Sequence, residues 1–127
     1  MMLFQNTKDH PHIFQILCGD KTETRRQAKK WVMKVGGEYP VHDASKGLFQ
    51  KREDAVCFIK CTARWEEKLG NLTEESACRE GLYSPVRFWD VWKELNGLCD
   101  LNEVVKVYQF EFLKYSTPAS WMTPEGK

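Results

Sequence analysis

One segment of the chain alternates between apolar and polar side chains, and it reads Ala55-Val56-Cys57-Phe58-Ile59-Lys60-Cys61-Thr62-Ala63-Arg64-Trp65. Its odd positions form an unbroken apolar series, whereas Lys60, Thr62 and Arg64 lie at even positions. Successive side chains of a β-strand point to opposite faces, so a period of two is typical of a strand with one buried face. The segment therefore predicts a strand, and with it a sheet at the centre of the fold.

Two further strands are predicted on either side of this segment. A strand is expected at Glu38–His42, after a glycine pair and before a polar loop over Asp43–Asp54. The last strand is expected at Val104–Leu113, where three aromatic side chains share one face, namely Tyr108, Phe110 and Phe112. These segments supply the partners that the first strand needs.

A short strand is also expected at Lys21–Arg26. Its threonines lie two residues apart and it has no helical apolar stripe. Thr22, Thr24 and Arg26 would then share one face. Lys21 would lie at the turn before the strand.

Three helices are predicted from apolar spacing and from capping residues. The first covers Pro11–Cys18 and ends at Gly19. The second follows Thr73, a favourable N-cap residue, and ends at Gly81. The third runs from Ser84-Pro85 to Gly97, and its apolar stripe consists of Phe88, Val91, Trp92 and Leu95.

The order of these elements indicates the fold class. Strands and helices are segregated without βαβ alternation, which favours an α+β fold built as a small, partly open β-barrel with flanking helices. At 127 residues the chain is long enough for one domain. We expect that domain at residues 1–114, followed by a mobile C-terminal tail at residues 115–127.

Composition excludes several classes of protein. Hydrophobic residues make up 42% of the chain and the formal net charge is +1, which excludes intrinsic disorder and a purely electrostatic nucleic-acid binder. Five cysteines, an odd number, do not suit a disulfide framework, so a reducing, cytoplasmic setting is expected. No signal peptide and no apolar run of about 18 residues is present, so no contact with a membrane is expected.

No metal or other cofactor is expected. Cys57 and Cys61 would lie about 13 Å apart along one strand, too far to share a tetrahedral ion, and are expected in the core. His10-Pro11-His12 is interpreted as a surface turn, because no second Cys/His pair accompanies it. Phe88 and Trp92 fit the core of their helix, whereas Trp89 falls outside its apolar stripe.

Two features of the sequence could carry function. Five basic residues with only one acid among them could contact phosphate or form a solvated basic face: Lys21, Arg25, Arg26, Lys29 and Lys30. Glu80 is expected in the last turn of its helix, where the negative end of the helix dipole raises the pKa of a carboxyl group. It could act as a general base or be an ordinary exposed glutamate.

The spacing Gly19-x-Lys21-x-x-Thr24-x-Arg26 resembles the signature of the ASCH domain, a relative of the PUA RNA-binding fold. The order of elements resembles that family from about His12 to Leu113. The resemblance implies a small β-barrel with a cleft that holds RNA or a nucleotide between the basic strand and the acidic helix end. It also implies ligand binding by Gly19, Lys21, Thr24 and Arg26.

Some members of the family are enzymes. A bacterial branch hydrolyses the acetyl amide of 4-acetylcytidine with a Lys, a Thr and a Glu, which match Lys21, Thr24 and Glu80. In such a reaction Glu80 would take a proton from water or from the Thr24 hydroxyl, and Lys21 would stabilise the oxyanion and pair with Glu80. Arg26 would hold a phosphate or a base edge. Those hydrolases are shorter and lack a Trp-rich helix such as Ser84–Leu95.

Three functions follow as hypotheses. The first is a domain, taken as a monomer, that binds RNA or a nucleotide in a basic cleft. The second is an amidohydrolase acting on 4-acetylcytidine or a related modified nucleoside. If the protein is an enzyme, a ribonuclease is the other, less favoured interpretation. The third is a protein-interaction module that uses Trp89, Trp121 and the tail.

Overall fold

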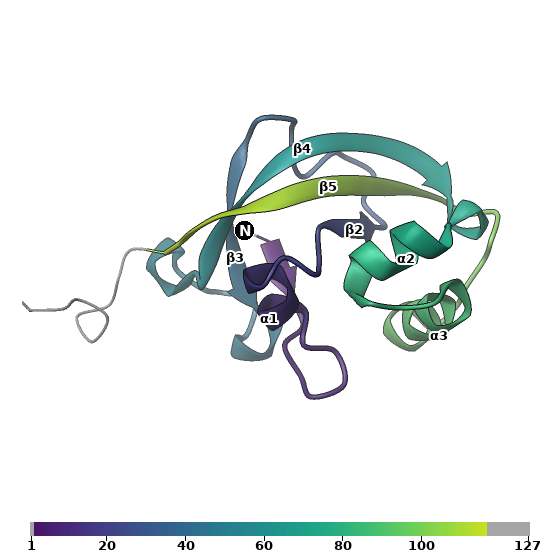
Figure 1. Ribbon diagram of the computed structural model, residues 1–127, viewed down its shortest axis with the longest axis horizontal. Helices are drawn as coiled ribbons and strands as arrows, with labels where there is room; N and C mark the ends of the chain where they lie inside the picture. Colours follow the sequence, from purple (N-terminus) through teal and green to yellow (C-terminus); the bar gives the residue numbers. More distant parts are fainter. Residues whose placement is uncertain (1, 117–127) are drawn as a thin grey trace, which may run out of the picture.

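The computed structural model describes residues 2–116 and contains a sheet with three α-helices (Figure 1). In chain order the main elements are β1 (Met2–Phe4), α1 (His12–Leu17), β2 (Glu23–Arg26), β3 (Glu38–Asp43), β4 (Cys57–Lys68), α2 (Glu74–Gly81), α3 (Pro85–Asn96) and β5 (Val104–Tyr115). Short 3-10 helices lie at Ala44–Lys46, Arg52–Asp54 and Leu69–Asn71. None of the described helices is long and apolar enough to cross a membrane.

The strands form one mixed sheet in the order β1-β3-β4-β5-β2. Strand β1 runs parallel to β3, and the other neighbours are antiparallel. The long β4–β5 pair is irregular at Phe58/Ile59 and at Cys61/Ala63. Strands β1 and β2 are the two edges and are not paired with each other, so the sheet is curved but not closed. The expected α+β class and partly open arrangement are confirmed.

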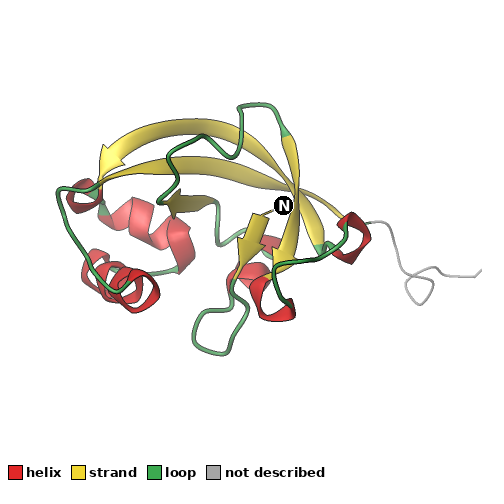
Figure 2. Ribbon diagram, turned by 180° about the vertical axis from the view of Figure 1, so that it is seen from behind, coloured by secondary structure: helices red, strands yellow, loops and turns green. Residues whose placement is uncertain are grey.

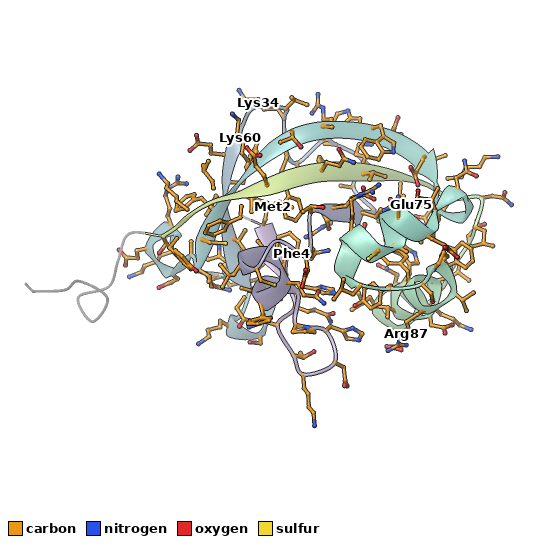
Figure 3. All side chains as sticks on the ribbon, in the orientation of Figure 1. Met2, Phe4, Lys34, Lys60, Glu75 and Arg87 are labelled. Carbon is orange, nitrogen blue, oxygen red and sulfur yellow. The ribbon has the colours of Figure 1, made fainter. Side chains whose placement is uncertain are left out.

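The helices lie on one side of the β4–β5 pair (Figures 1 and 2). A first core cluster contains Met2, Phe4, Ile13, Ile16, Met33, Val41, Cys57, Ile59, Cys61, Tyr108 and Phe110. A second cluster joins α2 and α3 to β5 and contains Leu69, Leu72, Ala77, Phe88, Trp92, Val105 and Val107. In Figure 3, Phe4 lies beneath the β4–β5 pair, whereas Lys34 and Lys60 lie above it.

Several sequence predictions are confirmed. The two buried cysteines Cys57 and Cys61 belong to the core, and α3 has Ser84 as N-cap and Gly97 in the left-handed region. Strand β4 continues beyond the predicted end to Lys68, and β5 continues to Tyr115, one residue into the expected tail. Residues 117–127, with Trp121, lie outside the described residues.

Three details of the sequence analysis need correction. Strand β1 was not expected, because three residues carry too short a pattern to reveal a strand. Helix α2 ends at Gly81, as predicted, but the residue in the left-handed region is Leu82, with a φ of 65°, rather than the glycine. Leu95 continues the apolar spacing of α3 but is 56% exposed and belongs to neither core cluster.

Candidate functional site

A pocket of about 240 Å³ lies between the edge strands and the helices, and we call it the central pocket. Strands β1 and β2 contribute Leu3, Phe4, Thr24, Arg25 and Arg26. Helix α3 contributes Phe88, Val91, Trp92, Leu95 and Asn96. The remaining lining residues are Gln5, His12, Lys21, Gln27, Glu80 and Tyr83.

Lys21 reaches this pocket from the turn before β2, as the sequence predicted. Gly19 has a φ of +85°, which allows the chain to turn after α1, and the backbone N–H of Lys21 donates to Gln15 O. The ammonium group of Lys21 donates to three oxygens: Glu23 O at 2.9 Å, Glu80 O at 2.5 Å and Glu80 Oε1 at 3.4 Å. Lys21 is only 3% exposed, so this cation is held inside the protein.

Glu80 lies in the last turn of α2, and it is buried rather than exposed. One carboxylate oxygen faces Lys21, and the other accepts from Arg25 Nη1 at 3.0 Å. Burial raises the pKa of Glu80, and the positive charges of Lys21 and Arg25 oppose that rise. The direction agrees with the sequence expectation, but its main cause is burial rather than the helix dipole.

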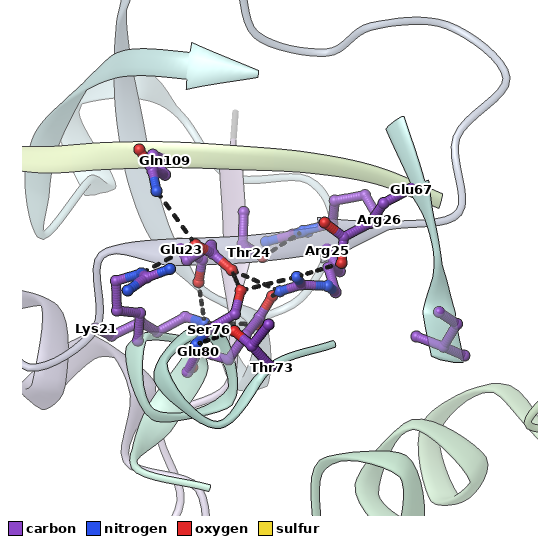
Figure 4. A network of polar contacts seen from close by, with 12 residues as sticks. Lys21, Glu23, Thr24, Arg25, Arg26, Glu67, Thr73, Ser76, Glu80 and Gln109 are labelled. Carbon is purple, nitrogen blue, oxygen red and sulfur yellow. Dashed lines mark hydrogen bonds and ion pairs between the residues drawn. The ribbon is translucent and has the colours of Figure 1, made fainter. Parts of the chain in front are cut away.

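Arg25 is at the centre of a buried network (Figure 4). Its guanidinium contacts three carboxylates, Glu23 at 2.7 Å, Glu67 at 2.8 Å and Glu80 at 3.0 Å, and also donates to Ser76 Oγ at 2.8 Å. Burial alone would lower the pKa of Arg25, but the three carboxylates raise it above its ordinary value. The guanidinium therefore points into the protein and is already paired.

Glu23 completes the network from the start of β2. It accepts from the Ser76 hydroxyl, from Arg79 Nε at 3.1 Å and from Gln109 at 3.4 Å, in addition to Arg25. Burial would raise the pKa of Glu23, but the hydrogen bonds from Ser76 and Arg25 hold it below its ordinary value. This carboxylate stays ionised and ties β2 to α2 and β5.

Thr24 and Arg26 lie on the same face of β2, as predicted. Arg26 Nε donates to Thr24 Oγ1 at 3.1 Å, and Arg26 Nη2 donates to Leu3 O at 3.0 Å. The guanidinium also lies over the Phe4 ring, 4.8 Å from its centroid. Arg26 thus bridges the unpaired edges of the sheet and forms part of the pocket wall.

Lys21 and Glu80 form a buried ion pair. Burial lowers the pKa of Lys21, although Glu80 opposes the shift, and burial raises the pKa of Glu80, although Lys21 and Arg25 oppose it. Both changes favour moving the proton from the ammonium to the carboxylate. Such opposed shifts at one site are typical of groups that perform acid-base chemistry.

One wall of the pocket is apolar and aromatic. Phe88, Val91 and Trp92 come from successive turns of α3, and the buried Trp92 Nε1 has no hydrogen-bond partner among the described residues. Trp89 instead donates from Nε1 to Leu69 O at 3.1 Å and does not border the pocket. A flat ligand with polar edges fits a pocket with one apolar and one charged wall.

His12 and Tyr83, which border the pocket, form a cluster with His10 that was not predicted from the sequence. His10 Nδ1 and His12 Nε2 each lie 2.8 Å from the Tyr83 hydroxyl oxygen. The sequence signal was His10-Pro11-His12, which we interpreted as a plain surface turn. Its partner Tyr83 is too distant in sequence for any local pattern to reveal the contact.

Gly81 leaves room for this cluster, and replacing it tests the packing. A Cβ at position 81 would lie 2.8 Å from the Tyr83 ring and 3.2 Å from His12 Nε2. Alanine normally stabilises a helix relative to glycine by about 1 kcal/mol, but here we expect Gly81→Ala to destabilise by about 1–3 kcal/mol because of overpacking. Urea unfolding measures the change, with Cys78→Ala on the exposed face of α2 as the control. A variant as stable as wild type would contradict the close packing.

The remaining candidate residues lie elsewhere. Lys29 and Lys30 are exposed, and Lys29 borders a separate shallow depression that also contains Lys106 and Glu66. Gly19 shapes the turn before Lys21 and is not part of the pocket lining. Within residues 2–116 no group of three or more His, Cys, Asp or Glu side chains is placed to hold a metal ion.

Similarity to known proteins is confined to structure. No family model and no curated protein matches the chain. A protein from Enterococcus faecalis V583 described by the family model DUF984 is 16% identical, with a TM-score of 0.62 over 80% of this chain and 66% of that one. An ASCH domain from Lactobacillus crispatus JV V101 is 15% identical, with a TM-score of 0.63 over 80% and 69%.

A third similar structure is ASCH from Zymomonas mobilis, at 11% identity and a TM-score of 0.54 over 90% of this chain and 71% of that one. The chain thus spans about two thirds of the length of these proteins. At such low identity the likeness establishes the architecture and not the activity. The chain therefore has the fold of ASCH domains.

Proposed function

We propose that the central pocket binds a nucleoside and hydrolyses an acyl amide on its base, with 4-acetylcytidine as the reference substrate. The observation that carries this proposal is that Lys21, Thr24 and Glu80 border one pocket although they come from a turn, a strand and a helix end. The buried Lys21–Glu80 pair adds the acid-base chemistry that amide hydrolysis needs.

The dimensions of the pocket favour a small ligand. Its volume of about 240 Å³ is below the range of about 300–1,000 Å³ that is common for drug-sized ligands. The ring systems of Phe88 and Trp92 offer one wall to a planar base, and Arg26 offers a cation at the other. A single nucleoside suits this space better than a folded polynucleotide.

The reaction assigns each residue a step. Glu80 takes a proton from water as the water oxygen bonds to the acyl carbon, and the carbonyl electron pair moves onto oxygen. The tetrahedral intermediate collapses, the C–N bond breaks, and the proton held by Glu80 passes to the departing amine. The products are cytidine and acetic acid, which ionises to acetate. Lys21 stabilises the ionised form of Glu80. The Thr24 hydroxyl oxygen accepts a hydrogen bond from Arg26, so its hydrogen can be donated to the ligand.

The decisive experiment is incubation of the protein with 4-acetylcytidine and chromatographic detection of cytidine and acetate. Release of both in equal amounts, with no release from N-acetylated lysine, supports the proposal. If cytidine does not form, hydrolysis of this substrate is wrong.

Binding without turnover is then the second candidate. The exposed Lys29 and Lys30 favour it, because both cations lie in water on the segment that follows β2. Titration with short RNAs at increasing salt tests it. Binding through phosphate contacts weakens as salt rises.

The activity is expected to have a narrow, bell-shaped pH dependence. Glu80 must be ionised and its pKa is raised by burial, so kcat/KM falls as pH drops through a value above 4.5. Lys21 must be protonated and its pKa is lowered by burial, so activity falls as pH rises through a value below 10.5. The charged groups that face this pair are Glu23, Arg25 and Arg26. Initial rates from about pH 4 to about pH 11 measure both sides of the pH profile. Apparent pKa values at the ordinary values of a glutamate and a lysine would contradict the roles given to Glu80 and Lys21.

A further inference from the structure

The Lys21 ammonium has no hydrogen left for a substrate. An ammonium carries three N–H donors, and those of Lys21 face Glu23 O, Glu80 O and Glu80 Oε1. Amide hydrolysis places negative charge on the carbonyl oxygen, which needs a donor at that position. Another side chain of the pocket must therefore supply it.

His12 borders the pocket and has a ring nitrogen to spare. Its Nε2 lies 2.8 Å from the Tyr83 hydroxyl oxygen, and no hydrogen bond within residues 2–116 involves its Nδ1. Burial, assisted by the positive charge of Lys21, lowers the pKa of His12 to about 3. The ring is consequently neutral at neutral pH and carries one proton, on either Nδ1 or Nε2.

The direction of the Tyr83 hydrogen bonds and the tautomer of His12 are coupled. It has a single hydrogen and lies between His10 Nδ1 and His12 Nε2, at 2.8 Å from each. When the hydroxyl donates to His12 Nε2, the proton of the neutral ring must be on Nδ1, and the Nδ1–H is then available as a donor. The hydroxyl accepts from His10 in that arrangement.

We propose that His12 is a catalytic residue whose Nδ1–H donates to the carbonyl oxygen of the acyl group, and that Tyr83 is the positioning residue that holds His12 in this tautomer. The inference rests on the proposed function and names the group that stabilises its oxyanion. As the water oxygen bonds to the acyl carbon, the carbonyl electron pair moves onto oxygen and the hydrogen bond from Nδ1 strengthens. His12 keeps its proton throughout, so the proton transfers described for Glu80 are unchanged.

A neutral donor suits this position. Lys21 and Arg26 already place positive charge beside His12, and a further cation there would be disfavoured by repulsion and by burial. A neutral imidazole N–H can polarise a carbonyl when its surroundings keep the ring unprotonated. The close packing of Gly81 against His12 and Tyr83 restricts movement of the ring.

Two substitutions of His12 distinguish the roles of its two ring nitrogens. His12→Gln retains a polar group near Nε2, facing Tyr83, but loses Nδ1, whereas His12→Asn retains an N–H near Nδ1. We expect His12→Gln to lower kcat by about 10²–10³-fold with little change in KM. His12→Asn is expected to remain within about tenfold of wild type, because its amide can still donate to the oxyanion.

Tyr83→Phe tests the positioning role, and thermal unfolding checks that every variant is folded. We expect kcat to fall at least about tenfold, and we expect no further loss when Tyr83→Phe is added to His12→Gln, because Tyr83 acts through His12. A purely structural role predicts additive losses.

The inference is overturned if folded His12→Gln keeps the wild-type kcat, if His12→Asn falls as far as His12→Gln, or if the losses add. In each case wild-type turnover would still support the proposed function. Absence of turnover by wild type would overturn both.

Discussion

Glu80→Gln is expected to lower kcat for 4-acetylcytidine by about 10²–10⁴-fold, the usual contribution of a general base. Glutamine has nearly the same size and can still accept from Arg25 Nη1, which now lies 3.0 Å from the carboxylate. It cannot take a proton from water, so the chemical step loses its base. Because the pocket keeps its shape, affinity for the product cytidine should change little.

The measurement compares kcat with cytidine binding by calorimetry in the same preparations. Glu75→Gln is the matched control, because Glu75 is an exposed glutamate in the first turn of the same helix (Figure 3). The control is expected to have wild-type kcat. Catalysis by Glu80 would be wrong if folded Glu80→Gln turned over substrate as fast as this control.

Arg25→Met is expected to have the largest effect on stability, a loss of about 3–5 kcal/mol in the free energy of unfolding. The substitution keeps an apolar stem but removes the cation that faces Glu23, Glu67 and Glu80. Carboxylates that lose their partner in a buried site must either stay charged at a high cost or take up protons. For a domain of marginal stability, a loss of this size is a large fraction of the total free energy of unfolding.

Arg79→Met provides the comparison for this prediction. Arg79 contacts the same Glu23 at 3.1 Å, but its side chain is 42% exposed. Partly exposed pairs contribute about 0–1 kcal/mol, so the control should unfold at nearly the wild-type urea concentration. Equal midpoints for Arg25→Met and Arg79→Met would show that the buried network does not stabilise the fold.

The sequence predicted the elements with strong periodicity and clear caps. Cys57, Ile59 and Cys61 alternate with polar residues in β4, and the Ser84-Pro85 start of α3 carries its own N-cap. These signals are local, since each depends on residues within a few positions. Strand β1 has no such signal and is held by pairing with β3 and by Arg26.

The candidate site was predicted less completely, because its contacts are distant in sequence. Lys21, Thr24 and Glu80 could be named from their resemblance to a motif, and the pocket brings them together. Arg25 looked like a surface cation within a basic run, since composition alone rarely indicates a buried charge. Its carboxylate partners lie on β4 and α2 as well as β2, and only the folded chain reveals them.

Strand β2 also constrains how the protein is made. Its register partner is β5, the last described strand, and Thr24 pairs with Tyr108. During translation at about 5–20 residues per second, Lys21 and Thr24 leave the ribosome well before β5. A nascent chain that has not yet reached Val104 lacks the strand against which β2 is aligned. Its charged side chains stay in water until then, so products truncated before β5 are expected to lack the central pocket.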